Sequence, residues 1–251
     1  MNRLKSLFLK TLIQTSDNII TSAWLKDRGI SKQLQYKYRQ SGLLQSIGRG
    51  ACVKFPAGKV TFEEALHVLQ QSGFRIHVGG YFALSLKSKT HYGKVKNTWS
   101  IFSSRDIKAP EWFLKYSFTD DWKHYKTNFL PENIGLEDFE VNQRIVKISS
   151  LERAAFELLY QTPKNEPVQE AYEIFEFLMT LRPNLLQQLL ENCKSIKVKR
   201  LFLYLSEKFS YSWFKYINLE SIDLGSGVRV ISRYGKFNKK YNIVIEERAN
   251  E

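Results

Sequence analysis

The sequence predicts an α+β protein in which an N-terminal winged helix-turn-helix precedes a larger mixed domain of strands and helices. Residues 20–55 carry helix caps and glycines at the spacing of two short helices and a hairpin. The remainder switches between strand-like and helix-like patterns. A chain of 251 residues is long enough for two cores, and we expect domains at 1–58 and 59–251.

The two helices of the small domain are defined by their ends. Thr21 can cap a helix over 21–28, which Gly29 ends because glycine adopts a positive φ without strain. Ser31 can cap a second helix, which runs to residue 41 and stops at Gly42. Leu34 and Tyr38, four residues apart, are expected to face the core.

A two-stranded wing follows the second helix. The segments 44–47 and 51–55 are strand candidates, and Gly48-Arg49-Gly50 joins them as a tight turn. Arg49 would project from the tip of this turn. Pro56 and Gly58 then mark the predicted end of the domain.

The positive charge is concentrated in the same region. Residues 1–60 hold eleven Lys and Arg against two acidic residues, whereas 61–150 and 151–251 each have a net charge of only +2. A local excess indicates a polyanionic partner, and nucleic acid or an anionic membrane surface would fit. The apolar run at 7–9 is too short for a signal peptide, so we expect an amphipathic first helix, a cytoplasmic protein and no membrane span.

The outward face of the second helix has the side chains of a DNA reader. Arg and Lys can pair with guanine and Gln with adenine in the major groove, and either cation can hold a phosphate. The predicted base-reading residues are Lys32, Gln33, Gln35, Tyr36 and Arg39, with Gln40 on the same face. The predicted phosphate-holding residues are Lys26, Arg28, Lys37, Arg49 and Lys54.

The larger domain is predicted to begin with a capping box, Thr61-x-x-Glu64, and a helix to about residue 72. A second capping box, Ser149-x-x-Glu152, opens a helical run. Strands are expected at 75–78, 98–103, 112–118, 143–148, 228–232 and 241–246. Further helices are expected at 168–181, 185–193 and 196–209.

We find no enzyme signature, and expect no catalytic residue, metal or cofactor. His67, His77, His91 and His124 lack metal-ligand spacing, although His77 and His91 flank Gly79-Gly80 and could meet. Asp138-x-Glu140 would share one strand face, as nucleotidyltransferase carboxylates do, but the required glycine turn lies far upstream. Asp106-x-Lys108 is half of a nuclease signature. Cys52 and Cys193 are expected to be free thiols.

Several blocks, in order, resemble the AbiEi-type antitoxins of type IV toxin–antitoxin (abortive infection) systems. The winged-helix blocks are Trp24-Leu25, Gly29-Ile30-Ser31, Ser41-Gly42-Leu43-Leu44 and Ile47-Gly48-Arg49-Gly50. The later blocks are His77-Val78-Gly79-Gly80-Tyr81, His91-Tyr92-Gly93, Ser149-Ser150-Leu151-Glu152-Arg153-Ala154, Lys197-Val198-Lys199-Arg200 and Gly225-Ser226-Gly227. The resemblance covers nearly the whole chain.

The resemblance implies an antitoxin that counteracts a nucleotidyltransferase toxin and represses its own operon by binding promoter repeats. Double-stranded promoter DNA, with inverted repeats, and the toxin are the implied partners, although direct contact with the toxin stays open. The neutralising residues are unknown; we expect Arg153, Lys197, Lys199 and Arg200 on exposed helix faces. Two alternatives remain: a transcription factor unrelated to a toxin, and a DNA-directed nuclease that uses Asp106 or Asp138.

Overall fold

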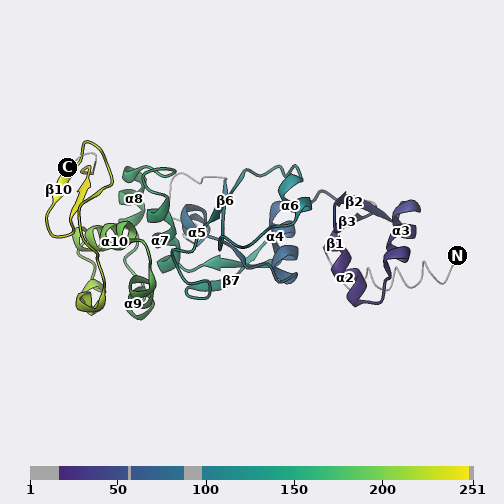
Figure 1. Ribbon diagram of the computed structural model, residues 1–251, viewed down its shortest axis with the longest axis horizontal. Helices are drawn as coiled ribbons and strands as arrows, with labels where there is room; N and C mark the ends of the chain where they lie inside the picture. Colours follow the sequence, from purple (N-terminus) through teal and green to yellow (C-terminus); the bar gives the residue numbers. More distant parts are fainter. Residues whose placement is uncertain (1–16, 56–57, 88–97, 249–251) are drawn as a thin grey trace. The chain divides into compact units, whose positions relative to one another are not determined.

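The computed structural model describes residues 17–55, 58–87 and 98–248 (Figure 1). The amphipathic helix expected at the start of the chain, His91 and Pro56 lie outside these ranges. Contacts divide the chain into two compact units. Unit 1 holds Met1–Ile76, Asp106–Asp121 and Glu140–Val146, and unit 2 holds the rest. The boundary expected after residue 58 falls within unit 1 and stays a prediction.

Unit 1 contains the winged helix. Its elements are β1 (Ile19–Thr21), α2 (Ser22–Asp27), α3 (Lys32–Gln40), β2 (Leu44–Gly48) and β3 (Ala51–Lys54). The sheet has the order β1-β3-β2, so it has one more strand than the sequence predicted. The apolar side chains of both helices pack on this sheet, and the fully buried members of the cluster are Ile20, Leu25, Ile30, Tyr38, Leu44 and Cys52.

The predicted caps of the winged helix are confirmed, and each helix ends one residue before its predicted end. The Thr21 hydroxyl accepts a hydrogen bond from the Trp24 N–H at 3.1 Å, and Ser31 accepts one from the Leu34 N–H at 3.2 Å. Gly29 (φ +79°) and Gly42 (φ +74°) take the left-handed conformation that ends each helix. The turn between α2 and α3 is therefore fixed locally by caps on both sides.

Unit 1 also contains two more helices, α4 (Phe62–Gln71) and α6 (Glu111–Lys115). Thr61 caps α4 as predicted, but the Glu64 carboxylate accepts hydrogen bonds from the Asn18 and Ile19 backbone N–H groups instead of turning back to the cap. The strand predicted at 112–118 is wrong. Trp112 and Phe113 belong to the short helix α6, which ends at Lys115, and Phe113 packs on Phe62 with ring centroids 5.6 Å apart.

Most residues of a five-stranded sheet lie in unit 2. Its strands are β4 (Ile76–Val78), β5 (Trp99–Ser103), β6 (Trp122–Lys126), β7 (Leu136–Val141) and β8 (Arg144–Ser149), in the order β6-β5-β4-β8-β7. β5 runs parallel to β6, and β4 runs parallel to β8. β6 and β7 were not predicted, since charged residues interrupt their apolar patterns.

Helices and a small second sheet make up the rest of unit 2. The helices are α5 (Gly80–Lys87), α7 (Leu151–Gln161), α8 (Val168–Phe175), α9 (Pro183–Asn192) and α10 (Ile196–Lys208), followed by the short turns η1 (Phe214–Tyr216) and η2 (Leu219–Ser221). The small sheet contains β9 (Arg229–Val230), β10 (Lys236–Asn238) and β11 (Ile243–Ile245). Within the described ranges, no helix has the length and apolar character needed to cross a membrane.

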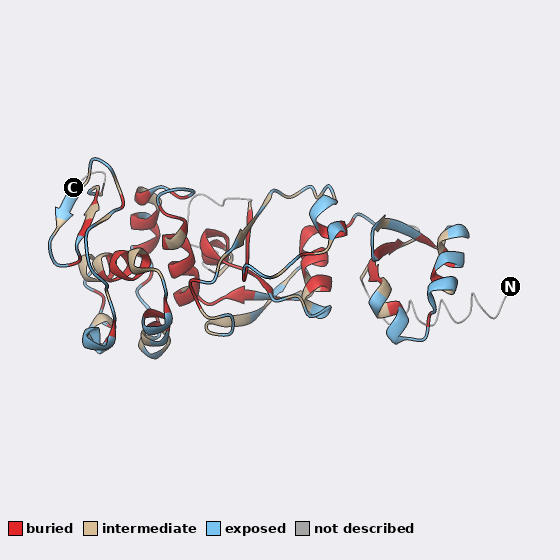
Figure 2. Ribbon diagram, in the orientation of Figure 1, coloured by how far each residue is buried: buried red, intermediate tan, exposed pale blue. Residues whose placement is uncertain are grey.

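Helix α7 is the central helix of unit 2 and is buried along nearly its whole length (Figure 2). It contacts α5, α8, α9 and α10. Its cap is Ser150, which accepts a hydrogen bond from the Arg153 N–H, and the predicted cap Ser149 is therefore wrong by one residue. A helix surrounded on all sides has no solvated face, so its polar residues must find partners inside the protein.

Candidate nucleic-acid interface

Helix α3 presents a polar face to solvent (Figure 2). At 100° per residue, Gln33, Tyr36, Lys37 and Gln40 share the side opposite Tyr38, and Lys32 lies at the edge of that group. All five are exposed, and Tyr36 exposes 57% of its surface. The structure therefore places most of the predicted base-reading set on one accessible surface, which we call the α3 face.

Gln35 is a correction to the predicted set. Its side chain is only 3% exposed. Its amide Nε2 donates hydrogen bonds to the carbonyl oxygens of Ile30, at 3.0 Å, and Ser22, at 3.3 Å. These carbonyls belong to the turn and to the start of α2, so Gln35 joins the two helices and its side chain is not presented to solvent.

Two cations of the predicted set also have partners within unit 1. Arg39 is half-buried beside the Cys52 thiol. Burial raises the pKa of this thiol, and the neighbouring Arg39 lowers it in part. Lys54 is half-buried, and burial holds its pKa below the usual range although the carboxylates of Asp17 and Glu64 oppose this. Its charge is balanced inside the unit, so we remove Lys54 from the phosphate-holding set. Arg39 stays in the set, at the margin of the α3 face.

The remaining predicted cations, Lys26, Arg28 and Arg49, are exposed. The Arg28 guanidinium lies 3.8 Å from the Trp24 ring centroid, which orders this long side chain at the end of α2. Arg49 occupies the wing turn as predicted. The neighbouring Gly48 (φ +139°) packs against α6: a Cβ there would lie 2.8 Å from the Trp112 Cβ.

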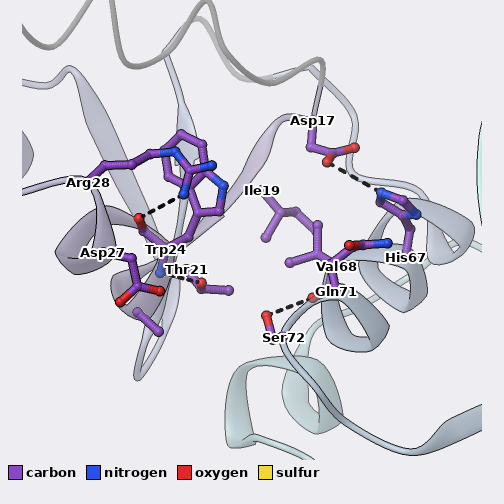
Figure 3. A pocket seen from close by; sticks show the side chains of 11 residues that line it. Asp17, Ile19, Thr21, Trp24, Asp27, Arg28, His67, Val68, Gln71 and Ser72 are labelled. Atoms are coloured by element: carbon purple, nitrogen blue, oxygen red, sulfur yellow. Dashed lines mark hydrogen bonds and ion pairs between the residues drawn. The ribbon is translucent and has the colours of Figure 1, made fainter.

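A pocket of about 530 Å³ separates α2 from α4 within unit 1 (Figure 3). Its walls include Trp24 from α2, Arg28 directly after that helix and His67 from α4, with Asp17 beside His67 at an Nε2–Oδ2 distance of 3.9 Å. No α3 residue lines it, so the pocket is separate from the α3 face.

Unit 2 contains a buried ionic cluster around Glu157. The carboxylate lies 2.8 Å from His77 Nε2 and accepts hydrogen bonds from Ser149 Oγ at 2.7 Å and the Gly80 N–H at 3.0 Å. Arg153 Nε donates to it at 2.8 Å and also bonds backbone carbonyls of the 131–134 turn through Nη1. The carboxylate caps the start of α5, which has no cap residue of its own.

The protonation states of the cluster follow from its burial. Burial raises the pKa of Glu157, but the charge of Arg153 and the hydrogen bonds from His77 and Ser149 outweigh it, so the pKa lies below the usual range. Burial also lowers the pKa of His77 more than Glu157 raises it. A neutral His77 therefore donates to an ionised Glu157. Gly79 is required here because a Cβ would lie 2.0 Å from Glu157 Oε2.

Three cations of α10 that were expected on exposed faces donate hydrogen bonds to backbone carbonyls. Arg200 is 2% exposed and donates to the carbonyls of Leu224 (2.8 Å), Gly225 (2.9 Å), Gly227 (2.5 Å) and Asn242 (3.1 Å). Lys199 donates to the Asp223 carbonyl and Lys197 to those of Tyr160 and Thr162. Arg153 is likewise buried. The Gly225-Ser226-Gly227 block is thus a loop that presents carbonyls to Arg200.

The remaining candidates do not assemble into one site. His67 Nδ1 lies 2.6 Å from the Ile145 carbonyl, and His124 Nε2 lies 2.8 Å from Ser103 Oγ. Asp138 and Glu140 are exposed on one face of β7, where Asp138 pairs with Lys147 at 2.8 Å. Across the described ranges, no three His, Cys, Asp or Glu side chains are grouped as metal ligands.

The chain was then compared with known proteins. Residues 5–95 match a family described as transcriptional regulator, AbiEi antitoxin N-terminal domain, and residues 96–246 match transcriptional regulator, AbiEi antitoxin, type IV TA system. No curated protein sequence matches. The crystal structure of the RV2827C protein from Mycobacterium tuberculosis is similar in fold, with a TM-score of 0.56 at 11% identity over 96% of this chain and 91% of that one. Two family matches that together span almost the entire sequence show that this chain belongs to the AbiEi antitoxin family of transcriptional regulators from type IV toxin–antitoxin systems.

Proposed function

We propose that this protein represses its own operon by inserting the α3 face into the major groove of promoter DNA. The observation that carries the proposal is the arrangement of α3, in which Lys32, Gln33, Tyr36, Lys37 and Gln40 face solvent together. Exposed Lys26, Arg28 and Arg49 are available for flanking phosphates. A winged helix of this kind places its second helix in the groove, and two copies would read inverted repeats.

Promoter binding is tested with the full-length protein and a labelled fragment of the DNA upstream of its gene. Lys32→Glu/Lys37→Glu reverses two charges on the α3 face, and we expect affinity to fall at least about a hundredfold at 150 mM salt. Lys164→Glu, at an exposed position of unit 2, is the matched control and should bind normally. Equal binding by the α3 double variant would refute the proposed interface.

We further propose that unit 2 supplies the antitoxin activity and counters a nucleotidyltransferase toxin. Family membership supports this proposal, and the buried clusters of α7 and α10 give unit 2 a rigid core on which such an activity can be built. Co-expression with the cognate toxin tests it. The full-length Lys32→Glu/Lys37→Glu variant should restore growth as well as the wild type does. Loss of rescue in that variant would show that the two functions are not separable.

A transcription factor with no link to a toxin is a weaker candidate, since the family match covers both parts of the chain. A nuclease is weaker still, because the carboxylates that suggested it form no common metal site: Asp138 pairs with Lys147 of β8, and across the described ranges no three potential metal ligands are grouped.

A further inference from the structure

The small sheet of β9, β10 and β11, which we call the C-terminal sheet, has an inner and an outer face. Ile243 and Ile245 of the central strand β11 are buried and define the inner face. Val244, between them, points to the outer face because side chains alternate along a strand. The register pairs Val244 with Val230 of β9 and with Phe237 of β10. An apolar row therefore crosses all three strands on the outer face.

The two outer members of this row are exposed to solvent, and Val244 between them is half-buried. Val230 exposes 64% of its surface and Phe237 exposes 54%. Tyr234, in the turn before β10, exposes 91%, and Val228 exposes 49%. Single exposed apolar residues are ordinary, but a contiguous group on one small sheet marks a contact surface. Figure 2 shows β10 in pale blue, in contrast to the buried helices of the same unit.

The positive charge around the apolar row indicates what kind of partner this surface can bind. Residues 226–240 contain five cations and no carboxylate. Lys236 and Lys240 pair with Glu247 and Glu207, but Arg233 and Lys239 pair with no acidic side chain of the described ranges. The Arg233 guanidinium lies 5.7 Å from the Tyr234 ring centroid. Exposed rings beside unpaired cations match a polyanion that carries flat apolar groups.

Other occupants fit this surface less well. In a two-fold contact with a second copy, each exposed cation would face the same cationic patch of its partner. A DNA duplex hides its base faces in the stack, so it would leave the Tyr234 and Phe237 rings without partners. A single strand offers both unstacked bases and phosphates.

We propose that the C-terminal sheet binds single-stranded nucleic acid, with bases stacked on Tyr234 and Phe237 and phosphates held by Arg233 and Lys239. This surface goes beyond the proposed promoter binding, because it shares no residue with the α3 face and prefers a different form of nucleic acid. It would give unit 2 a nucleic-acid contact of its own.

The test uses the full-length protein carrying Lys32→Glu/Lys37→Glu, so that binding by α3 is suppressed. Fluorescein-labelled oligouridylate and oligothymidylate of twelve nucleotides, and a duplex of the same length, are the probes for fluorescence anisotropy. We expect both single strands to bind more tightly than the duplex. Tyr234→Ala/Phe237→Ala should weaken single-strand binding at least about twentyfold, because two stacked bases lose their platforms.

The matched control retains both rings. Tyr234→Phe/Phe237→Tyr should bind within about threefold of the parent, since either ring supports stacking. Arg233→Met/Lys239→Met should reduce the slope of log K against log salt by about 1.4, at roughly 0.7 per phosphate on a single strand. Comparison of the two single-stranded probes distinguishes RNA from DNA as the ligand.

Three results would overturn the proposal. The first is no binding of either single strand by the parent, and the second is equal binding by the alanine variant. The third is self-association in sedimentation velocity that the alanine variant abolishes, which would assign the row to a second copy. Both alanine positions are exposed, so the circular dichroism spectrum and melting temperature should stay unchanged.

Discussion

Helices α3 and α10 contain similar cationic residues and use them in opposite ways. In α3, Lys32 and Lys37 extend into solvent from a helix that buries only its other side. In α10, Lys199 and Arg200 are buried, and their N–H groups donate to the carbonyls of the 223–227 loop. Positive charge therefore indicates a binding surface only where its hydrogen-bond donors have no partners within the protein.

A local count of charged residues identifies the exposed cationic surface of the winged helix, but it does not identify the cations of residues 151–251. The excess in residues 1–60 includes the cations of an exposed surface. The balanced count in residues 151–251 conceals both the buried cations of α10 and the basic, aromatic C-terminal sheet. Buried cations tie elements together, and exposed ones are available to a partner. Removing a buried charge or its partner should therefore reduce stability, whereas removing an exposed cation should reduce DNA affinity.

The largest effect is expected at the buried ionic cluster. Glu157→Gln would leave the Arg153 guanidinium without its counter-charge, and the free energy of unfolding should fall by about 3 kcal/mol. Urea unfolding measures this change. Glu173→Gln, at an exposed position of α8, is the matched control and should change stability by less than about 0.5 kcal/mol. Similar losses in the two variants would contradict a central role for the cluster.

A smaller loss of stability is expected at Arg200. Arg200→Met keeps much of the side-chain volume but removes the guanidinium donor from the carbonyls of Leu224, Gly225 and Gly227, at a cost of about 2 kcal/mol. Lys37→Met on the α3 face should cost less than about 0.5 kcal/mol. If urea unfolding gave the two variants the same stability, the distinction between buried and exposed cations would fail.

The exposed cations should instead control DNA affinity. In Lys37→Met, loss of one phosphate contact should reduce the slope of log K against log salt by about 0.9. Lys199→Met, measured where it is fully folded, should keep the wild-type slope because its ammonium is committed to the Asp223 carbonyl. Titration of promoter DNA at several salt concentrations gives both slopes. A reduced slope for Lys199→Met would indicate that DNA contacts α10, which contradicts the proposed α3 interface.

The smallest effect is a pH dependence at Lys197, where burial lowers the pKa from 10.5 to about 8. Between these values the unfolded chain binds more protons than the folded protein, so the wild type should gain stability as pH rises from about 8 to 10.5. Because the side chain is partly solvated, the gain should be modest. Lys197→Met should remove this gain in urea unfolding at pH 8 and pH 10; an unchanged pH profile would contradict the shift.

Much of the winged helix could be predicted because its signals are local. Caps at Thr21 and Ser31 and the glycines at 29 and 42 act within one helical turn, and the structure confirms them. Gln35 could not be placed this way, because its partners are backbone carbonyls brought close only by folding. Periodicity identified the side of α3 that carries Tyr38 but not how far burial extends around the helix.

In the larger domain, residue types gave wrong predictions of secondary structure and of exposure for several buried residues. The aromatic residues at 112–118 suggested a strand, yet Trp112 and Phe113 lie in a short helix that packs on Phe62. Arg153, Lys199 and Arg200 suggested solvated faces because cations are seldom buried. Their backbone-carbonyl partners are brought close only by folding, and no sequence pattern reveals them. The Arg153–Glu157 pair differs, because its four-residue spacing on one helix can be read from the sequence.

Photocrosslinking tests most directly whether promoter DNA contacts the α3 face. A benzophenone side chain placed at Tyr36 in the full-length protein should form a covalent adduct with the labelled promoter fragment on irradiation. The same probe at the exposed position Lys164 of unit 2 is the control and should form none. An adduct at Lys164 with none at Tyr36 would contradict the assignment of α3 as the DNA-reading helix.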